Sequence, residues 1–198
     1  MPVTQRDEIF EIIIKHVSDH GWSDEIVSLV NADIQKTSST EKPVFSGVKD
    51  LISDFLERND NLMLSSLEKV DINKLRIRQR IRKAVITRLL QIPKGVIKHT
   101  AKFLANPLNS DVALKSLANT CDKIWYWAGD ESTDFNYYTK RILLGAVYTA
   151  SLAYYLKEEE CSTDDLSIFV ENRIDNVLKL GDVKNKFKKV SDFLMKRV

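Results

Sequence analysis

The sequence predicts an all-α protein, and three observations lead to that prediction. Apolar residues recur at helical spacing, for example Ile9, Phe10, Ile13 and Val17 near the N-terminus. Only six glycines and four prolines occur among 198 residues, which favours long helices with few tight turns. No segment alternates apolar and polar residues with the period of a strand, and no Asn-Gly or Asp-Gly hairpin signal occurs.

Capping residues and glycines place the first three helices. Thr4 can cap a helix that ends at Gly21, and Ser23 can cap a second helix with acids in its first turn. The polar run 36–43 predicts a loop. Val48 then opens a third helix, whose apolar residues again follow the helical period.

Further signals divide the rest of the chain. The segment 62–69 is expected to form a separate short helix. Asp71 or Asn73 starts a long basic helix that stops before Pro93. The total is nine to ten helices, because more are expected at about 94–105, 111–128, 135–156 and 164–179, with a last one from Val183 onward.

The composition is that of a soluble protein with one continuous core, since 43% of the residues are hydrophobic and 29% are charged. No segment approaches the roughly 18 apolar residues of a membrane span. The N-terminus has neither the apolar run of a signal peptide nor the Arg-rich character of a transit peptide. Cys121 and Cys161 fit no metal-binding spacing and are expected as reduced thiols, with a disulfide as the alternative.

Charge is distributed unevenly along the chain. Residues 1–60 carry 12 acids and 6 bases, whereas residues 74–102 carry 10 bases and no acid. The basic segment has two interpretations: a surface for anionic lipid or an acidic protein, or a solvated helix face. If the segment is a solvated helix face, its apolar side chains should face the core. These are Leu75, Ile77, Ile81, Val85, Leu89 and Ile92.

The N-terminal third resembles the DNA-binding arrangement of TetR-type transcription regulators. A helix ends at Gly21-Trp22, and a second helix, a polar loop and "VFSGVKDLISDF" follow. DNA binding needs cations that neutralise phosphates, but this part of the chain is acidic. A TetR-type ligand-responsive regulator is therefore the alternative function, and no nucleic-acid partner is expected.

The C-terminal tail has the pattern of an interfacial amphipathic helix. Val183, Phe187, Val190, Leu194 and Val198 form one helical stripe, and lysines flank it. We expect this tail to bind an anionic membrane surface reversibly, and the alternative is a helix packed on its own domain. The residues expected to contact the membrane are Phe187, Val190, Leu194, Lys188 and Lys189.

No residue pattern indicates catalysis. His16 and His20 stand at i and i+4 and could hold a metal, but a surface pair is the expected interpretation, and a structural role is expected for His99. The sequence has no phosphate loop, dinucleotide motif or Glu-x-x-His pair. We therefore expect no catalytic residue, no metal site and no enzyme activity.

The segment 125–141, "WYWAGDESTDFNYYTKR", joins two expected helices and is crowded with rings. Capping explains its short polar residues, among them Asp130 and Asp134. Trp125 to Trp127 are consecutive, so at 100° per residue their rings cannot all face one core. Some rings should be partly exposed, as at protein-docking surfaces.

"WYWAGDESTDFNYYTKRILLGAVY" closely resembles the signature of the ninth coenzyme Q biosynthesis protein family. "GW", "FSG" and "LRIRQRIRKAVITRLL" stand at corresponding places, so the resemblance covers nearly the whole chain. It implies a TetR-like all-α fold and a homodimer formed through C-terminal helices. It also implies a bound isoprenoid lipid or phospholipid, with no other cofactor.

The same resemblance implies a function in ubiquinone biosynthesis without enzyme activity. Such a protein binds an isoprenoid quinone intermediate at the membrane and presents it to a di-iron demethoxyubiquinone hydroxylase. A bacterial form would be cytoplasmic and peripheral at the inner membrane, and a processed eukaryotic form would lie on the matrix side of the mitochondrial inner membrane. Three parts are expected. Residues 1–60 form a degenerate helix-turn-helix-like part, residues 61–181 form the lipid-binding and dimerisation bundle, and residues 182–198 form the membrane helix.

Carried over residue by residue, the hydroxylase-binding patch would contain Asp134, Tyr137, Tyr138 and Arg141. The family more typically has Trp where this chain has Tyr137, which keeps a ring but loses contact area. For the lipid pocket the sequence nominates helix faces only, with plain core as the alternative for each residue. The nominated residues are Leu114, Leu117, Ile124, Leu143 and Val147.

Overall fold

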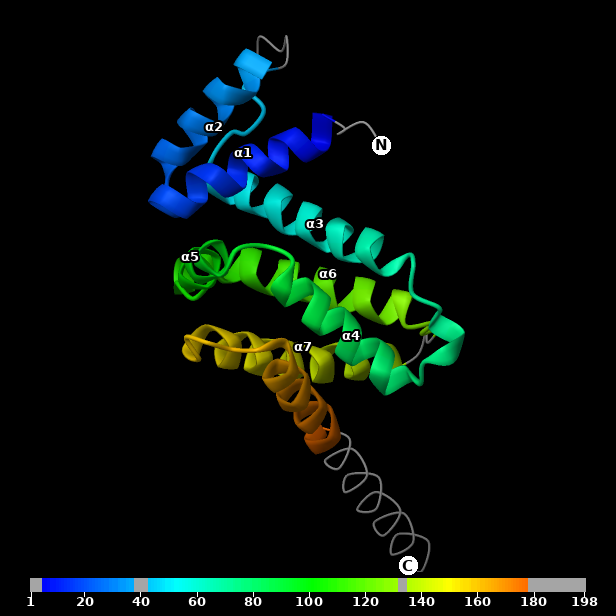
Figure 1. Ribbon diagram of the computed structural model, residues 1–198. Coiled ribbons are helices and arrows are strands. Elements are labelled where there is room, and N and C mark those ends of the chain that lie inside the picture. Colours follow the sequence, from blue (N-terminus) through cyan, green and yellow to red (C-terminus); the bar gives the residue numbers. More distant parts are fainter. Residues whose placement is uncertain (1–4, 38–42, 132–134, 178–198) are drawn as a thin grey trace, which may run out of the picture.

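The computed structural model describes residues 5–37, 43–131 and 135–177, and these residues form helices and connections without a strand (Figure 1). The side chains of residues 5–7, 135 and 136 are not described. The elements are α1 (Gln5–His20), α2 (Asp24–Thr37), α3 (Val48–Leu67), η1 (Ile72–Lys74), α4 (Ile77–Leu90), α5 (Lys94–Leu104), η2 (Pro107–Asn109), α6 (Ser110–Trp127) and α7 (Phe135–Lys157). A further helix covers residues 163–177.

The all-α prediction is confirmed, and the number of helices in the described residues is slightly lower than the nine to ten expected. Part of the difference lies in α3, which continues to Leu67 where a separate helix at 62–69 was expected. Asn59 and Asp60 do not break α3, because Gln91 donates to Asn59 and Arg88 donates to Asp60. The helix expected from Val183 onward lies outside the described residues.

The predicted start of the basic helix is also wrong. Asp71 caps a short 3-10 turn, accepting a hydrogen bond of 3.2 Å from the Asn73 backbone. The α-helix begins only after Arg76, where the Gln79 side chain accepts from the Arg76 backbone N–H at 2.8 Å. The expectation that Ile77 faces inward is also wrong, because this side chain is exposed.

A polar side chain fixes the connection between α2 and α3. Asn31 of α2 accepts from the backbone N–H groups of Val44 and Phe45, at 3.0 Å each, and donates to the Phe45 carbonyl at 2.8 Å. These three bonds pair one side chain with the backbone much as a neighbouring strand would. In the described part of this connection, residues 43–47, the chain forms no helix.

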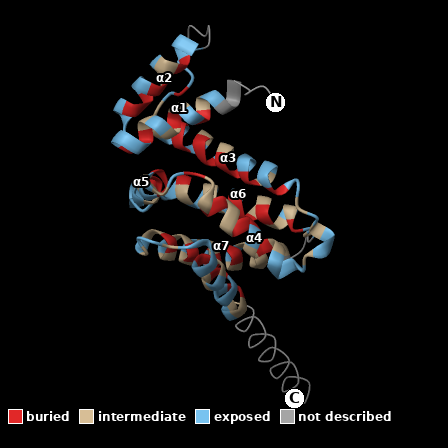
Figure 2. Cartoon of the chain, in the orientation of Figure 1, coloured by how far each residue is buried: buried red, intermediate tan, exposed pale blue. Residues whose placement is uncertain are grey.

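The core is continuous from α1 to the helix at 163–177 (Figure 2). α6 is the central helix, because it packs on α3 on one side and on α7 on the other. α3 also continues through residue 60, the boundary expected between the first two parts of the chain. The N-terminal helices and the bundle therefore share one helix and one core.

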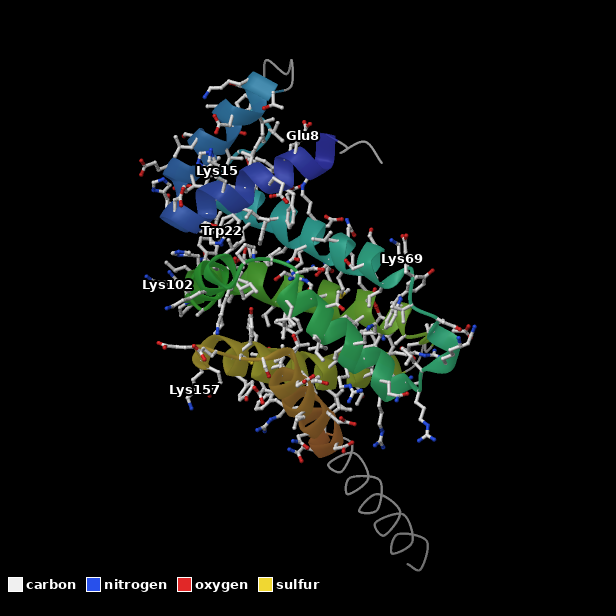
Figure 3. All side chains as sticks on the ribbon, viewed as in Figure 1. Glu8, Lys15, Trp22, Lys69, Lys102 and Lys157 are labelled. Atoms are coloured by element: carbon white, nitrogen blue, oxygen red, sulfur yellow. The ribbon has the colours of Figure 1, made fainter. Side chains whose placement is uncertain are left out.

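Trp22 attaches the N-terminal helices to the bundle. Its ring lies 5.2 Å from the Phe55 ring and 6.5 Å from the Phe103 ring, and its Nε1 donates to Thr100 at 3.1 Å. Figure 3 places it between α1 and α5. Gly21 before it has a φ of +73°, and a Cβ there would lie 2.9 Å from the His99 ring.

The basic segment 74–102 is largely engaged within the chain. Arg78 pairs with Asp175 at 3.0 Å, and Arg82 pairs with Glu171 at 2.5 Å. Both acids belong to the helix at 163–177, which places opposite charges across from α4. These contacts favour the interpretation of this segment as a structural helix face over that of a free basic surface.

Candidate functional site

The end of α6 is fixed by a Schellman cap. The backbone N–H of Gly129 donates to the Tyr126 carbonyl and that of Asp130 donates to the Trp125 carbonyl, both at 3.0 Å. Gly129 has a φ of +88°, a conformation that side chains with a Cβ disfavour. The cap turns the chain toward α7 and forms the aromatic corner, which comprises residues 125–131 and 137–142.

Two carboxylates hold the start of α7 against the end of α6. Asp130, with a side chain only 3% exposed, accepts from Lys140 at 2.5 Å and from Arg141 at 3.1 Å. Asp122 accepts from Arg141 Nε at 2.7 Å and from the Tyr137 hydroxyl at 2.9 Å. Burial lowers the pKa of Arg141, but the hydrogen bonds to both carboxylates outweigh it and raise the pKa above its ordinary value.

The rings of the aromatic corner fall into two sets. Trp125 and Trp127 are partly buried and pack on the core, and Trp125 Nε1 donates to the Lys140 carbonyl at 3.0 Å. Tyr126 is 78% exposed and Tyr138 is 66% exposed. The expectation that some rings reach solvent is confirmed for these two residues.

Three of the four predicted partner residues meet at this corner. Arg141 lies over the Tyr137 ring, with Cζ 3.3 Å from the ring centroid, and the rings of Tyr137 and Tyr138 pack edge to face at 5.1 Å. Arg141 itself is only 13% exposed. Asp134 lies outside the described residues. Tyr126 and Ile142 were not among the predicted partner residues, but both are highly exposed and add apolar surface to the aromatic corner.

An apolar cavity of about 420 Å³ lies among α3, α4, α5, α6 and α7. Its size falls within the roughly 300–1,000 Å³ of ligand pockets. Leu114 of α6, which is 70% exposed, and the exposed Thr149 and Ala153 of α7 mark its opening between these two helices. Its apolar wall includes Phe55, Ile92, Ile97, Leu104, Leu117, Leu152 and Leu156.

Two of the five residues nominated for a lipid pocket line the apolar cavity, and three do not. Leu114 and Leu117 line the apolar cavity. Ile124 is 0% exposed and Val147 is 3% exposed, and neither lines the cavity, nor does Leu143. The periodicity that selected all five residues identifies the inward face of a helix but not the unfilled volume beside it.

Sequence reasoning also missed a polar group of side chains on the buried wall of the apolar cavity. Asn59, Arg88, Thr120 and Tyr148 come from four different helices and all line it. The one signal in the sequence was the placement of Asn59 and Arg88 at apolar-face positions of their helices. Such buried polar residues require partners or a ligand.

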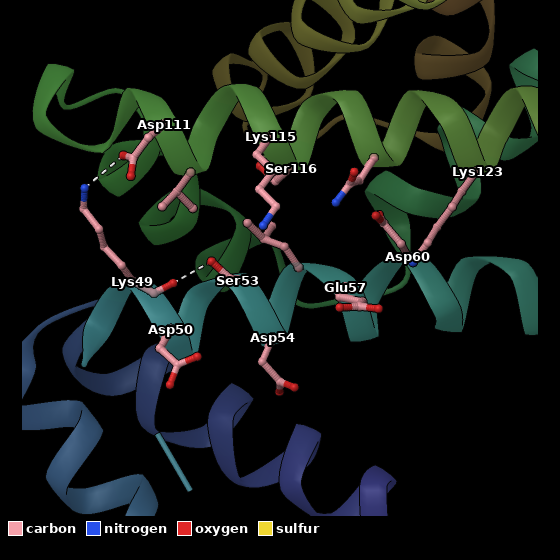
Figure 4. Close-up of a pocket in the computed structure, with 13 residues that line it drawn as sticks. Lys49, Asp50, Ser53, Asp54, Glu57, Asp60, Asp111, Lys115, Ser116 and Lys123 are labelled. Carbon is pink, nitrogen blue, oxygen red and sulfur yellow. Dashed lines mark hydrogen bonds and ion pairs between the residues drawn. The ribbon is translucent and has the colours of Figure 1, made fainter. Parts of the chain in front are cut away.

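A separate polar groove of about 770 Å³ runs between α3 and α6 (Figure 4). Lys49 bridges its walls, with Nζ 2.9 Å from Asp111 and 2.8 Å from the Leu108 carbonyl. Its lining includes acidic residues of α3 and lysines of α6, although Asp50 and Asp54 point away from α6 in Figure 4. Because its walls carry both charges, this groove does not have the character of a lipid site.

Comparison with known proteins matches residues 110–181 to the COQ9 family, a range that contains α6, α7 and the helix at 163–177. The protein named "Ubiquinone biosynthesis protein coq9, mitochondrial" of Schizosaccharomyces pombe is 30% identical over 181 residues. That alignment covers 89% of this chain and 71% of the yeast protein. The chain belongs to the COQ9 family.

Other COQ9 relatives align along almost the same length. The rat protein is 28% identical and the human protein 27% identical, and each alignment covers 94% of this chain. Both are named as mitochondrial ubiquinone biosynthesis proteins. The chain spans only 63% of the rat protein and 62% of the human protein.

The fold of this COQ9 family member is also that of a TetR regulator. A crystal structure of a TetR transcriptional regulator from Nitrosomonas europaea superposes with a TM-score of 0.62 and covers 87% of this chain and 97% of the regulator. At 14% identity, the likeness extends to the fold alone. The TetR-like fold that the sequence resemblance implied is confirmed.

Two other predicted features are the histidines of α1 and the membrane-contacting residues of the tail. His16 contacts Asp33 of α2, with Nε2 2.8 Å from Oδ2, so it takes part in a pair between two helices. The expected membrane-contacting residues 187–194 lie outside the described part of the COQ9 chain. Within the described part, no helix is long and apolar enough to cross a membrane.

Proposed function

We propose that this COQ9 family member is a non-enzymatic lipid-binding accessory protein of ubiquinone biosynthesis. It binds an isoprenoid quinone intermediate at the membrane and presents it to a di-iron demethoxyubiquinone hydroxylase. The observation that carries this proposal is the apolar cavity of about 420 Å³ that opens between α6 and α7. The names of the relatives supply the ubiquinone context.

The location of the cavity supports transfer to a partner. α6 and α7 form its opening, and the same two helices form the aromatic corner at their other end. A hydroxylase docked on Tyr126, Tyr138 and Ile142 would contact the helix pair through which the lipid must leave. The proposal includes a homodimer and a tail, residues 182–198, that binds an anionic membrane surface.

Lipid extraction followed by mass spectrometry tests the binding activity. The purified full chain should yield an isoprenoid lipid or a phospholipid. Ala101→Phe should reduce the yield, because Ala101 lines the cavity and the larger ring would fill it. Ala118→Phe is the matched control, since Ala118 is exposed on α6 and lies outside the cavity. A folded wild-type protein without any lipid would contradict the proposal.

A ligand-responsive transcription regulator is the second candidate, and the TetR-like fold is the observation that favours it. The charges oppose it, because residues 1–60 carry twice as many acids as bases. A mobility shift with duplex DNA at low salt separates the two candidates, since only a regulator should bind and lose affinity steeply with added salt.

A further inference from the structure

The wall of the apolar cavity carries buried polar side chains, away from the exposed residues of its opening. Leu114 at the opening is 70% exposed, whereas Asn59 is 1% exposed and Arg88 is 4% exposed. Burying a guanidinium and an amide beside apolar side chains is costly unless their N–H groups find acceptors. The acceptors of these two groups therefore decide whether their burial is costly.

Arg88 has one acceptor among the described residues. Its Nε donates to Asp60 Oδ1 at 2.6 Å, and the Thr120 hydroxyl holds the same carboxylate at 2.9 and 3.1 Å from its two oxygens. Neither Nη atom of Arg88 forms a further hydrogen bond with a described residue. Since a guanidinium carries most of its N–H donors on these two atoms, Arg88 keeps unused donors at the cavity wall.

Two more donors stand on the same wall. Asn59 Nδ2 is buried and has no hydrogen-bond partner within the described chain, because Gln91 engages only the Asn59 oxygens. The Tyr148 hydroxyl likewise has no hydrogen-bond partner among the described residues. Burial raises the pKa of Tyr148, so its hydroxyl keeps its proton and can donate. Gln91 Oε1, the other buried atom without a partner, does not line the cavity.

We propose that Arg88, Asn59 and Tyr148 bind the carbonyl oxygen of an amphiphile whose head lies inward and whose apolar chain leaves between α6 and α7. All three residues offer hydrogen-bond donors, so the ligand group must be an acceptor. Asp60 already balances the charge of Arg88, and a neutral carbonyl therefore fits better than an anion. The inference rests on the proposed lipid-binding function and adds the chemistry and orientation of the ligand.

Three probes with one chain length test the head group by isothermal titration calorimetry: a decyl-substituted benzoquinone, decylbenzene and decanoate. The wild-type protein should bind the quinone about tenfold more tightly than decylbenzene, the gain expected from one net hydrogen bond. Decanoate should bind more weakly than the quinone. Tighter binding of decanoate would overturn the assignment of a neutral carbonyl.

Variants locate the head group. Tyr148→Phe keeps the ring and should reduce the preference for the quinone severalfold. Asp60→Asn combined with Arg88→Met removes both buried charges together, which avoids an unpaired carboxylate, and should abolish the preference while decylbenzene still binds. Arg82→Met on the same helix is the control, because Arg82 pairs with Glu171 away from the cavity.

The outcomes separate this inference from the proposed function. An unchanged quinone preference in both the Tyr148 variant and the double variant, each folded by circular dichroism, would overturn the assignment of the inner wall. Binding of decylbenzene without any quinone preference in the wild-type protein would do the same and leave lipid binding intact. Failure of a folded wild-type protein to bind any of the probes would overturn the lipid-binding proposal itself.

Discussion

Arg141 lies over the Tyr137 ring, with its Cζ 3.3 Å from the ring centroid, while the Tyr137 hydroxyl donates to Asp122 at 2.9 Å. This arrangement makes Tyr137 part of the support for the aromatic corner. The freely exposed ring beside it is Tyr138, at 66% exposure. If the hydroxylase docks at this corner, we therefore expect Tyr138 to contact it more directly than Tyr137.

Substitutions at these two tyrosines should separate docking from support. We expect Tyr138→Ala to weaken hydroxylase binding by about 1–3 kcal/mol, as truncation of an interface ring does, with little change in thermal stability. Tyr137→Phe should leave binding nearly unchanged and lower the free energy of unfolding slightly through the lost hydrogen bond. Pull-down and thermal melting measure the two effects. Equal hydroxylase binding by wild type and Tyr138→Ala would remove Tyr138 from the docking surface.

Asp130 should be the residue on which the corner depends most for stability. Its almost fully buried carboxylate accepts from Lys140 and Arg141. Asp130→Ala would leave Arg141, 13% exposed, with one carboxylate fewer, and we expect a loss of about 3 kcal/mol in denaturant unfolding. Asp111→Ala serves as the comparison, because Asp111 and Lys49 form an exposed pair, and such pairs contribute little to stability. Similar losses for the two variants would contradict this assignment.

The Schellman cap gives a prediction about a single methyl group. Gly129→Ala places a Cβ on a residue with a φ of +88° and 3.2 Å from Arg80 Nη1, the atom that donates to the Ala128 carbonyl. We expect a loss of about 1–2 kcal/mol. Gly95→Ala is the matched control, because no atom lies within 4 Å of its added Cβ and Ala is the better helix former. Opposite signs in thermal melting are the expected result.

Local signals in the sequence predicted most of the fold. Ser23 stands before α2, where its Oγ accepts from the Ile26 N–H at 3.4 Å, and Gly129 ends α6 as expected. The predictions failed where tertiary partners outweighed local preference. Asn59 and Asp60 have the composition of a turn. Gln91, just after α4, donates to Asn59, and Arg88 of α4 and Thr120 of α6 donate to Asp60, so both residues stay inside a continuous helix.

The candidate site could be predicted only in part. A ring-rich corner is visible in the sequence because its residues are contiguous. A cavity is built from residues of five elements and exists only where their side chains fail to fill the volume between them. Leu117 borders that volume and Ile124 does not, although both are inward-facing residues of α6.

The C-terminal tail carries a prediction that does not depend on the bundle. Deletion of residues 183–198 should lower co-sedimentation with anionic vesicles while the circular dichroism melting of the bundle persists. Lys188→Gln and Lys189→Gln should each weaken vesicle binding about fivefold, since one basic residue near an anionic surface contributes about 1 kcal/mol. Equal sedimentation of the full and shortened chains would refute the membrane assignment.

Cys121 offers a probe of the α6–α7 contact that frames the cavity opening. Its thiol is 1% exposed, and burial, with a smaller contribution from the Asp60 charge, raises its pKa to about 12. Because the thiolate is the reactive form, we expect Cys121 in a Cys161→Ser background to resist Ellman's reagent at pH 8 and to react only when the helices separate. Gly145 of α7 lies against it, where an added Cβ would come 3.8 Å from its sulfur.

The reciprocal variant completes this test. In a Cys121→Ser background the partly exposed Cys161 should be labelled faster, although burial also raises its pKa. Denaturant should bring the two rates together, because both thiols then have ordinary pKa values. If a lipid must pass between α6 and α7, a bound decyl benzoquinone should slow the labelling of Cys121 and leave that of Cys161 unchanged. Equal labelling rates for the two thiols in the folded protein would show that α6 and α7 do not shield Cys121.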